Sequence, residues 1–520
     1  MCEHKYSTMK LPILFSLAFL FVNFSTLSAQ QLEVSDLVKT SSDEDLYIIG
    51  GDDEGVYVGL AEDYYMSGSG NKQVISYYSM DEVEALESQV MKQQERSREF
   101  FYTFYFQNQL HTLSHDTKES DDGLFHVYLN SYDQQMEPAG EEMDLDQVYP
   151  YFFSFDVSSV FRSYFSSQFG KMRKGMFISH KASPAANKLA LFFDFNYFTA
   201  SEANFQCVVL GEDREVQWTD LIDLPEDGSN LLLEDYALDD NGNLYILMAA
   251  FENSNFKKTA NDFEYRLFQY DPEAGEASQV DFDTQGKFIT NMGLSLGPDQ
   301  MPVLGGIYAD PLSNDIEGGL MVRVNEGSVT ETKTLEFERS VLREINDDDD
   351  KESAEEYTIK HTIAEDDGSI VFFAESYKRG PIVSAKLRLS AFNPLDTDVE
   401  IGDIYKKIMA VRITPDQQGD WVEIVDKTQK STESKDIYTS YALAYDDEAY
   451  YLLYNEDIKS SSDIYMATLK KEGGMSHGVL MDRSDYRMRL IPEFGQMPVP
   501  GVLTVPVEKS GRQGVLRVKF

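Results

Sequence analysis

A short pattern that recurs through the second half of the chain constrains the fold more than any other feature. Each copy is a turn rich in Asp, Asn and Gly, followed by a run of apolar and often aromatic residues. The copies occupy residues 237–248, 296–304 and 363–373, with two looser copies at 183–193 and 444–453. They lie roughly 55 to 80 residues apart, a spacing typical of four-stranded β-propeller blades with variable loops.

A second kind of segment follows each copy. It alternates apolar and polar residues, which places the apolar side chains on one face of a sheet, and it runs into a turn. Examples are residues 265–272, 319–326, 385–394 and 463–469, with weaker candidates at 74–78 and 124–129 in the first half. Residues 514–520 also alternate and could complete the last blade or close the ring with an N-terminal strand. The pattern predicts an all-β chain, a β-propeller of about seven blades (six to eight), with aromatic side chains packed between the sheets.

One copy of the turn carries a family resemblance. The stretch from Asp239 to Ile246 has the form D-x-x-G-N before an apolar strand, and it resembles the blade signature of NHL-type and gluconolactonase-like β-propellers. Gly242 would supply the positive φ that such a tight turn requires. Gluconolactonase-like enzymes hold a divalent metal at the central opening of the propeller, with ligands from different blades. The resemblance therefore implies a propeller and, as one alternative, a metal-dependent hydrolase or lactonase.

Two stretches interrupt the strand pattern. Residues 81–98 contain good helix formers and neither Gly nor Pro, which predicts a helix inserted between blades. Residues 141–175 mix aromatic and polar residues around Pro150, which predicts further short helices.

The N-terminus has the order of regions that is typical of a secretory signal peptide. Lys5 and Lys10 precede an apolar stretch over residues 11–22, and small residues follow at Ser28 and Ala29. The apolar stretch is shorter than the roughly 20 residues of a membrane-spanning helix. We therefore expect a signal peptide at residues 1–29, a propeller at residues 30–520, and a secreted or periplasmic protein that is not inserted in a membrane.

The cysteine content and the charge fit this environment. Cys2 would be removed with the signal peptide, which leaves Cys207 with no partner for an intramolecular disulfide. The chain has 90 acidic and 45 basic residues, a formal net charge of −45. Such a surface repels nucleic acid, so no nucleic-acid partner is expected. The acidic residues could form a solvating shell or provide several sites for divalent cations.

The polar residues of the repeated turns are the candidate metal ligands. Carboxylate and amide oxygens of this kind bind calcium, but short polar side chains are also ordinary turn formers. The candidates are Asp239, Asp240, Asn241, Asn243, Asp366 and Asp367. No complete EF-hand loop is present. On a helix, the i, i+4 spacing of His111 and His115 would place both imidazoles on one side as zinc ligands, but the strand formers before them favour a strand, on which they would lie about 13 Å apart.

No sequence motif identifies a reaction. The chain has no glycine-rich phosphate loop, so catalytic residues stay unassigned and no organic cofactor is indicated. Cys207 lies in an apolar stretch typical of a buried strand. Two functions remain. The first is an exported binding or scaffolding propeller, without catalysis, that holds a protein, peptide or glycan ligand. The alternative is the metal-dependent hydrolase or lactonase.

Overall fold

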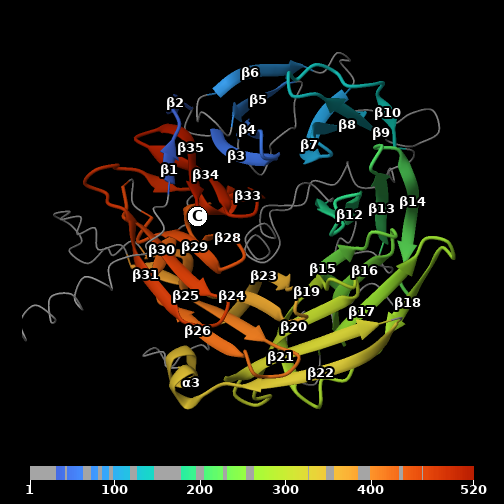
Figure 1. The fold of residues 1–520 in the computed structure, drawn as a ribbon, viewed down its shortest axis with the longest axis vertical. Coiled ribbons are helices and arrows are strands. Elements are labelled where there is room, and N and C mark those ends of the chain that lie inside the picture. Colours follow the sequence, from blue (N-terminus) through green and yellow to red (C-terminus); the bar gives the residue numbers. More distant parts are fainter. Residues whose placement is uncertain are drawn as a thin grey trace, which may run out of the picture.

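The chain folds into a ring of antiparallel sheets, seen face-on in Figure 1. The computed structural model describes residues 31–40, 44–62, 72–79, 85–92, 98–116, 126–145, 177–194, 204–225, 231–252, 263–325, 327–346, 356–383, 399–431, 437–458 and 461–520. The described residues form eight sheets. The protein is therefore an all-β, eight-bladed propeller, at the upper end of the predicted range of six to eight blades.

Seven blades are built from strands that follow one another along the chain. Blade 1 contains β3 (Glu44–Gly51), β4 (Gly55–Glu62), β5 (Lys72–Ser79) and β6 (Ala85–Lys92), and blade 2 contains β7 (Arg98–Phe106), β8 (Gln109–Asp116), β9 (Val127–Tyr132) and β10 (Met143–Asp144). Blade 3 contains β11 (Phe177–Ala182), β12 (Lys188–Asp194), β13 (Asn204–Gly211) and β14 (Val216–Asp223), and blade 4 contains β15 (Leu231–Leu238), β16 (Leu244–Phe251), β17 (Phe263–Asp271) and β18 (Glu276–Val280). Blade 5 contains β19 (Phe288–Leu296), β20 (Pro302–Ala309), β21 (Ile316–Asn325) and β22 (Ser328–Glu336). Blade 6 contains β23 (Glu356–Ala364), β24 (Ile370–Val383), β25 (Val399–Ile413), β26 (Trp421–Val425) and the short β27 (Gln429–Ser431). Blade 7 contains β28 (Ala442–Tyr445), β29 (Ala449–Asn455), β30 (Ile464–Lys470) and β31 (Met475–Met481).

Blade 8 closes the ring by combining strands from the two ends of the described chain. It contains β32 (Arg489–Leu490), β33 (Gln496–Val499), β34 (Val502–Lys509), β35 (Arg512–Lys519), β1 (Gln31–Val34) and β2 (Val38–Lys39), with the 3-10 helix η5 (Pro492–Phe494) before β33. β1 runs antiparallel to β35, and Glu33 Oε2 accepts hydrogen bonds from Nε (2.9 Å) and Nη2 (2.5 Å) of Arg517. The alternating residues 514–520 thus complete the last blade and pair with the N-terminal strand.

Each blade is layered from the ring axis to the rim. The first strand lies nearest the axis and the last lies at the rim (Figure 1). Every residue of β16 and β20, the second strands of blades 4 and 5, is buried, whereas the rim strand β31 is largely exposed. A middle strand is covered on both faces by neighbouring blades, and this explains its continuous apolar sequence.

The core consists of apolar clusters between neighbouring blades. Eight clusters in the described residues fill the eight interfaces around the ring, including the one between blades 1 and 8. The largest fully buried side chains are all aromatic: Tyr57, Tyr308, Tyr450, Tyr454, Phe104, Phe192, Phe193, Phe205, Phe268 and Phe372. Packing between the sheets therefore accounts for many of the aromatic residues, as expected.

The helix predicted for residues 81–98 is wrong over the part of this stretch that the structure describes. Residues 85–92 form β6 at the rim of blade 1, and β7 begins at Arg98. β6 pairs with β5 along its length, with Val90 opposite Val74. Pairing with a neighbouring strand outweighs the weak preference of this stretch for a helix.

The second helical prediction is largely untested. Met143–Asp144 forms β10, and residues 146–175 lie outside the described residues. A short helical insertion is present elsewhere, as α3 (Arg339–Asn346) between blades 5 and 6. In the part of the chain that the structure describes, no helix has the length and apolar character needed to cross a membrane.

The connections between strands divide into two sets, because neighbouring strands are antiparallel. Those between first and second strands, and between third and fourth strands, emerge on one face of the ring, here called the turn face. All other connections emerge on the opposite face, here called the loop face. Turn-face connections are mostly tight turns, whereas the ends of the strands at the loop face are joined by long segments such as 337–355 and 384–398. β24 and β25, with 14 and 15 residues, extend blade 6 toward the loop face.

Candidate functional site

The repeated acidic turns lie on the turn face, between the first and second strands of blades 3 to 7. In blade 4, the buried carboxylate of Asp239 shapes its own turn. Oδ1 accepts hydrogen bonds from the backbone N–H groups of Asn241 (2.9 Å) and Asn243 (2.8 Å), and Oδ2 accepts one from Asn243 Nδ2 (2.7 Å). Gly242 has a φ of +97°, as the sequence predicts. Three donors already occupy this carboxylate, which leaves it little capacity for a metal ion.

Asp240 connects the turns of three neighbouring blades. Its Oδ1 accepts a hydrogen bond from the backbone N–H of Ala185 in blade 3 (2.9 Å), and its Oδ2 accepts one from the side-chain amide of Gln300 in blade 5. Gln300 Oε1 in turn accepts a hydrogen bond from the backbone N–H of Asp240 (2.8 Å). This predicted metal ligand therefore acts as a link between blades.

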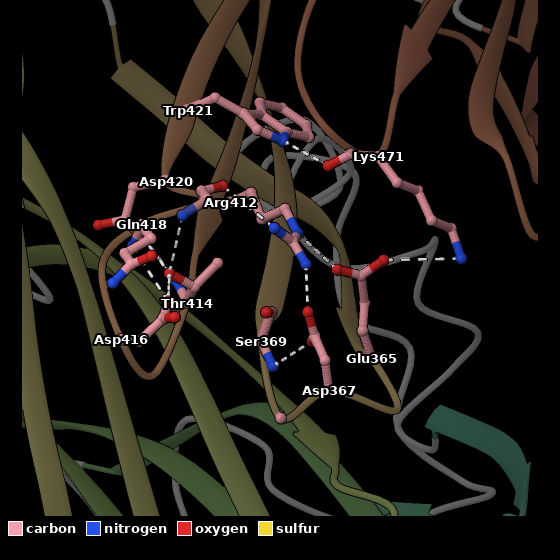
Figure 2. Close-up of polar contacts among 12 residues, drawn as sticks. Glu365, Asp367, Ser369, Arg412, Thr414, Asp416, Gln418, Asp420, Trp421 and Lys471 are labelled. Atoms are coloured by element: carbon pink, nitrogen blue, oxygen red, sulfur yellow. Dashed lines mark hydrogen bonds and ion pairs between the residues drawn. The ribbon is translucent and has the colours of Figure 1, made fainter.

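The remaining acidic candidates lie in the equivalent turn of blade 6. Asp367 pairs with Arg412 of β25, with 2.5 Å between Oδ2 and Nη2, and its Oδ1 accepts a hydrogen bond from the Ser369 N–H at 2.8 Å (Figure 2). Burial acts to raise the pKa of Asp367, but the bonds from Ser369 and the charge of Arg412 outweigh it, so the pKa is lowered. Asp366 is exposed. Blade 5 separates this turn from Asp239, so the structure does not bring the two candidate groups together.

Glu365, at the start of the same turn, is buried at the boundary between blades 6 and 7 (Figure 2). Its Oε2 accepts a hydrogen bond from Arg412 Nε at 2.6 Å, and its Oε1 accepts one from the Tyr450 hydroxyl at 2.5 Å. Lys471 Nζ lies 3.6 Å from Oε1. Burial and the bond to Glu365 raise the pKa of Tyr450, so its hydroxyl stays protonated and donates. One carboxylate thus joins two blades through two hydrogen bonds and an ion pair.

The adjoining turn between β25 and β26 is internally bonded (Figure 2). Asp420 Oδ1 accepts hydrogen bonds from the N–H (2.7 Å) and the hydroxyl (2.8 Å) of Thr414, and Arg412 Nη1 donates to the Gly419 carbonyl at 3.1 Å. Trp421 Nε1 donates across the blade boundary to the Lys471 carbonyl at 3.0 Å. The cluster in Figure 2 is therefore a bonded network that fastens blade 7 to blade 6.

A second buried ion pair lies at the loop-face end of the same interface. Lys427 Nζ is 2.5 Å from Glu375 Oε1, and neither side chain has any exposed area. Nζ also donates to Gln429 Oε1 at 2.7 Å, and Glu375 Oε2 accepts a hydrogen bond from the Ser440 hydroxyl at 2.6 Å. Burial lowers the pKa of Lys427, and the nearby Glu375 carboxylate only partly opposes this shift. The pair fixes β24 to the connection that leads into blade 7.

The histidine pair and the cysteine have structural positions. His111 is buried in β8, where Nε2 donates to the Phe106 carbonyl (3.0 Å) and Nδ1 accepts from the Ser131 hydroxyl (2.9 Å). Burial lowers its pKa to about 4, so the ring is neutral at physiological pH. His115 Nδ1 donates to a backbone carbonyl at 2.7 Å. Cys207 is buried in β13, as its apolar stretch predicts, and burial raises the pKa of its thiol.

These groups are arranged to hold the blades together. Among the described residues, no three His, Cys, Asp or Glu side chains come together as a metal site would require. Sequence reasoning had no signal for Glu365, Arg412, Glu375 or Lys427, because each partner lies in a different strand or connection.

No protein-family model matches the chain, and no curated protein matches its sequence. Solved structures do match it. The polysaccharide lyase Uly1 aligns with 94% of this chain and 99% of its own, at 10% identity and a TM-score of 0.42. The WD40 domain of SCAP from fission yeast aligns with 94% of this chain and 98% of its own, at 7% identity and a TM-score of 0.40. The β-propeller domain of the Trilobed protease from Pyrococcus furiosus aligns with 82% of this chain and 94% of its own, at 9% identity and a TM-score of 0.34. These similarities carry no argument about function.

Proposed function

We propose that this protein is an exported, non-catalytic binding propeller that holds a protein, peptide or glycan ligand on its loop face. The division of connections between the two faces carries the proposal. On the turn face most connections are short, and carboxylates such as Asp239, Asp240 and Glu365 are engaged within turns or between blades. The longest connections, such as 337–355 and 384–398, leave strand ends on the loop face. Binding residues are commonly found on loops held by a rigid scaffold.

Blade 6 gives this face its most prominent feature. β24 and β25 run past the start of β23, because Glu356 at that start is opposite Tyr377 whereas β24 continues to Val383. The Glu375–Lys427 pair holds the base of this projecting part, and the Glu365 network holds the turn-face ends of the same two strands. A hairpin fixed in this way can present a ligand-binding surface with little loss of conformational freedom on binding.

The binding test uses residues 30–520 on an array of neutral glycans, acidic glycans and peptides. A loop-face variant replaces residues 384–398 with Asn-Gly, and Asp366→Asn serves as the turn-face control because Asp366 is exposed. We expect binding to at least one array component, an affinity at least tenfold lower in the loop-face variant, and an unchanged affinity in the control. Binding to no component, or binding lost only in Asp366→Asn, contradicts the proposal.

Export is part of the proposal and rests on the sequence of residues 1–29, which lie outside the described residues. A buried thiol at Cys207 suits an oxidising compartment, because it is shielded from disulfide exchange. Expression of the full chain in a bacterial host, followed by fractionation and N-terminal sequencing, tests it. We expect a mature chain that begins near residue 30 outside the cytoplasm. An uncleaved chain that stays in the cytoplasm contradicts export.

A further inference from the structure

Three basic residues line up side by side across blade 8, where its sheet reaches the loop face. Lys39 in β2 lies opposite Arg512 in β35, and Arg512 lies opposite Lys509 in β34. Residues directly opposite each other in antiparallel strands carry their side chains on the same face of the sheet, with Cβ atoms about 5 Å apart. The three cations therefore form a row across three strands, here called the blade 8 cation row.

No carboxylate neutralises this row within the described part of the chain. Lys39 and Arg512 are exposed and Lys509 is half-buried, and none of the three forms an ion pair with a described residue. The adjacent carboxylate, Glu508, instead accepts hydrogen bonds from Arg489 (2.6 Å) and Tyr438 (2.5 Å). Like charges directly opposite each other destabilise a sheet, so the row is unfavourable unless an anion lies against it.

The row is unusual in a chain with 90 acidic and 45 basic residues. Residues 482–520 reverse this balance, with seven Lys and Arg against four Asp and Glu. Tyr486 and Arg487 are exposed just before β32. Arg489 in β32 lies opposite Glu508 in β34, and Glu508 precedes Lys509. A further cation and an exposed aromatic ring thus directly precede the strand that pairs with β34 next to Lys509.

We infer that the blade 8 cation row binds linear acidic polysaccharides through their carboxylate or sulfate groups. This inference rests on the proposed function, because the row lies at the loop face. Arg512, in the middle, can donate two parallel hydrogen bonds to one anionic group, while Lys39 and Lys509 provide point charges on either side. The exposed ring of Tyr486 offers an apolar surface on which a sugar ring can pack.

The charge of the rest of the molecule favours a narrow ligand. A globular acidic protein or a nucleic-acid duplex would bring many negative charges close to a chain whose formal net charge is −45. A single polysaccharide chain can place a few anionic groups on the row and keep the others away from the acidic surface. This difference favours an acidic glycan over the other polyanions.

The test measures binding of residues 30–520 to polygalacturonate and to dextran sulfate by isothermal titration calorimetry, with uncharged dextran as the reference. We expect binding to at least one charged polymer, weaker binding as the salt concentration rises, and no binding to dextran. The triple variant Lys39→Gln, Lys509→Gln, Arg512→Gln should bind at least tenfold more weakly. Its melting temperature should equal or exceed that of the wild type, because the row of like charges is gone.

Single substitutions provide the matched control. Arg512→Gln should weaken binding at least threefold, whereas Lys470→Gln, an exposed lysine on the turn face, should leave the affinity unchanged. The inference is wrong if neither charged polymer binds, if the triple variant binds like the wild type, or if single-stranded DNA binds the row equally well. If both polymers fail but replacement of residues 384–398 abolishes binding of another ligand, only this inference is lost. If no ligand depends on the loop face, the proposed function fails as well.

Discussion

Replacing Lys427 with methionine removes the only cation paired with Glu375 among the described residues, and the Glu375 carboxylate stays buried away from water. In the native protein Lys427 Nζ lies 2.5 Å from Glu375 Oε1, and both side chains are wholly buried. Methionine fills much of the same space, but it leaves Ser440 as the remaining donor to Glu375 among the described residues. Removal of one partner of a buried ion pair costs about 3–5 kcal/mol. We therefore expect the free energy of unfolding to fall by about 4 kcal/mol.

A double-mutant cycle separates the pair from the packing around it. Glu375→Gln combined with Lys427→Met leaves no buried charge, so it should recover most of the loss and unfold within about 1–2 kcal/mol of the wild type. Urea unfolding followed by tryptophan fluorescence gives each value. The control is Glu264→Gln, because the Glu264 side chain is 63% exposed and its pair with Arg266 should contribute less than about 1 kcal/mol. The reasoning is refuted if Lys427→Met costs no more than this control, or if the double variant is as unstable as the single one.

Three further outcomes follow from the described geometry. Gly242→Ala should lower the free energy of unfolding by about 1–2 kcal/mol, because its φ of +97° strains any residue with a Cβ. Gly478→Ala is the control: it adds a Cβ in open space and should not change unfolding by urea. Arg517→Gln should release the closing strand, so limited proteolysis should cleave residues 31–39 faster than in the wild type, and an unchanged rate would contradict this role. Burial raises the pKa of Tyr308 from 10 to about 12. Its folded pKa exceeds its unfolded value, so the stability it contributes is complete below pH 10 and is lost as the pH rises toward 12. The part of the tyrosinate absorbance that Tyr308→Phe removes should therefore appear together with unfolding, and its appearance in the folded protein near pH 10 would refute this.

The number of blades was harder to predict than the fold because the repeated turn does not occur in every blade. Blades 3 to 7 carry the turn between their first two strands, and blade 1 has a shorter acidic turn at residues 52–54 that was not counted as a copy. The equivalent connections are Gln107 and Asn108 in blade 2, and Pro500 and Gly501 in blade 8. A two-residue hairpin needs no aspartate to form its turn, so these blades left a weaker pattern. The estimate of about seven blades was low for this reason.

The helix at residues 81–98 was predicted from composition, and composition failed for a physical reason. A rim strand has a neighbouring strand on one edge only, so sequences without the usual β-formers are tolerated there. Polar helix formers such as Glu87, Gln89 and Lys92 gave this stretch its helical composition. The decisive fact is the pairing of β6 with β5, which is not a property of the local sequence.

Local sequence patterns also could not predict how the residues of the candidate site are paired. The acidic turn residues were recognised from local spacing, but their roles depend on partners in other blades, as with Asp240 and Gln300. Glu365 and Tyr450 are 85 positions apart, and no local pattern relates them. The blade 8 cation row depends on the register between strands from opposite ends of the chain, which places Lys39 opposite Arg512. Such contacts become visible only when the ring is closed.

The two ion-pair networks of blade 6 account for a division of roles between the faces. At the turn face, Glu365 is engaged by donors from its own blade and from blade 7, so a substitution there changes how the blades are joined. At the loop face, the Glu375–Lys427 pair holds the base of the longest hairpin in the described chain. A loop-face ligand would thus meet a hairpin whose base is already ordered, and it would not have to supply the free energy of ordering that base. Loss of the Lys427 charge should therefore weaken any binding that uses this hairpin while leaving the blade 8 cation row intact.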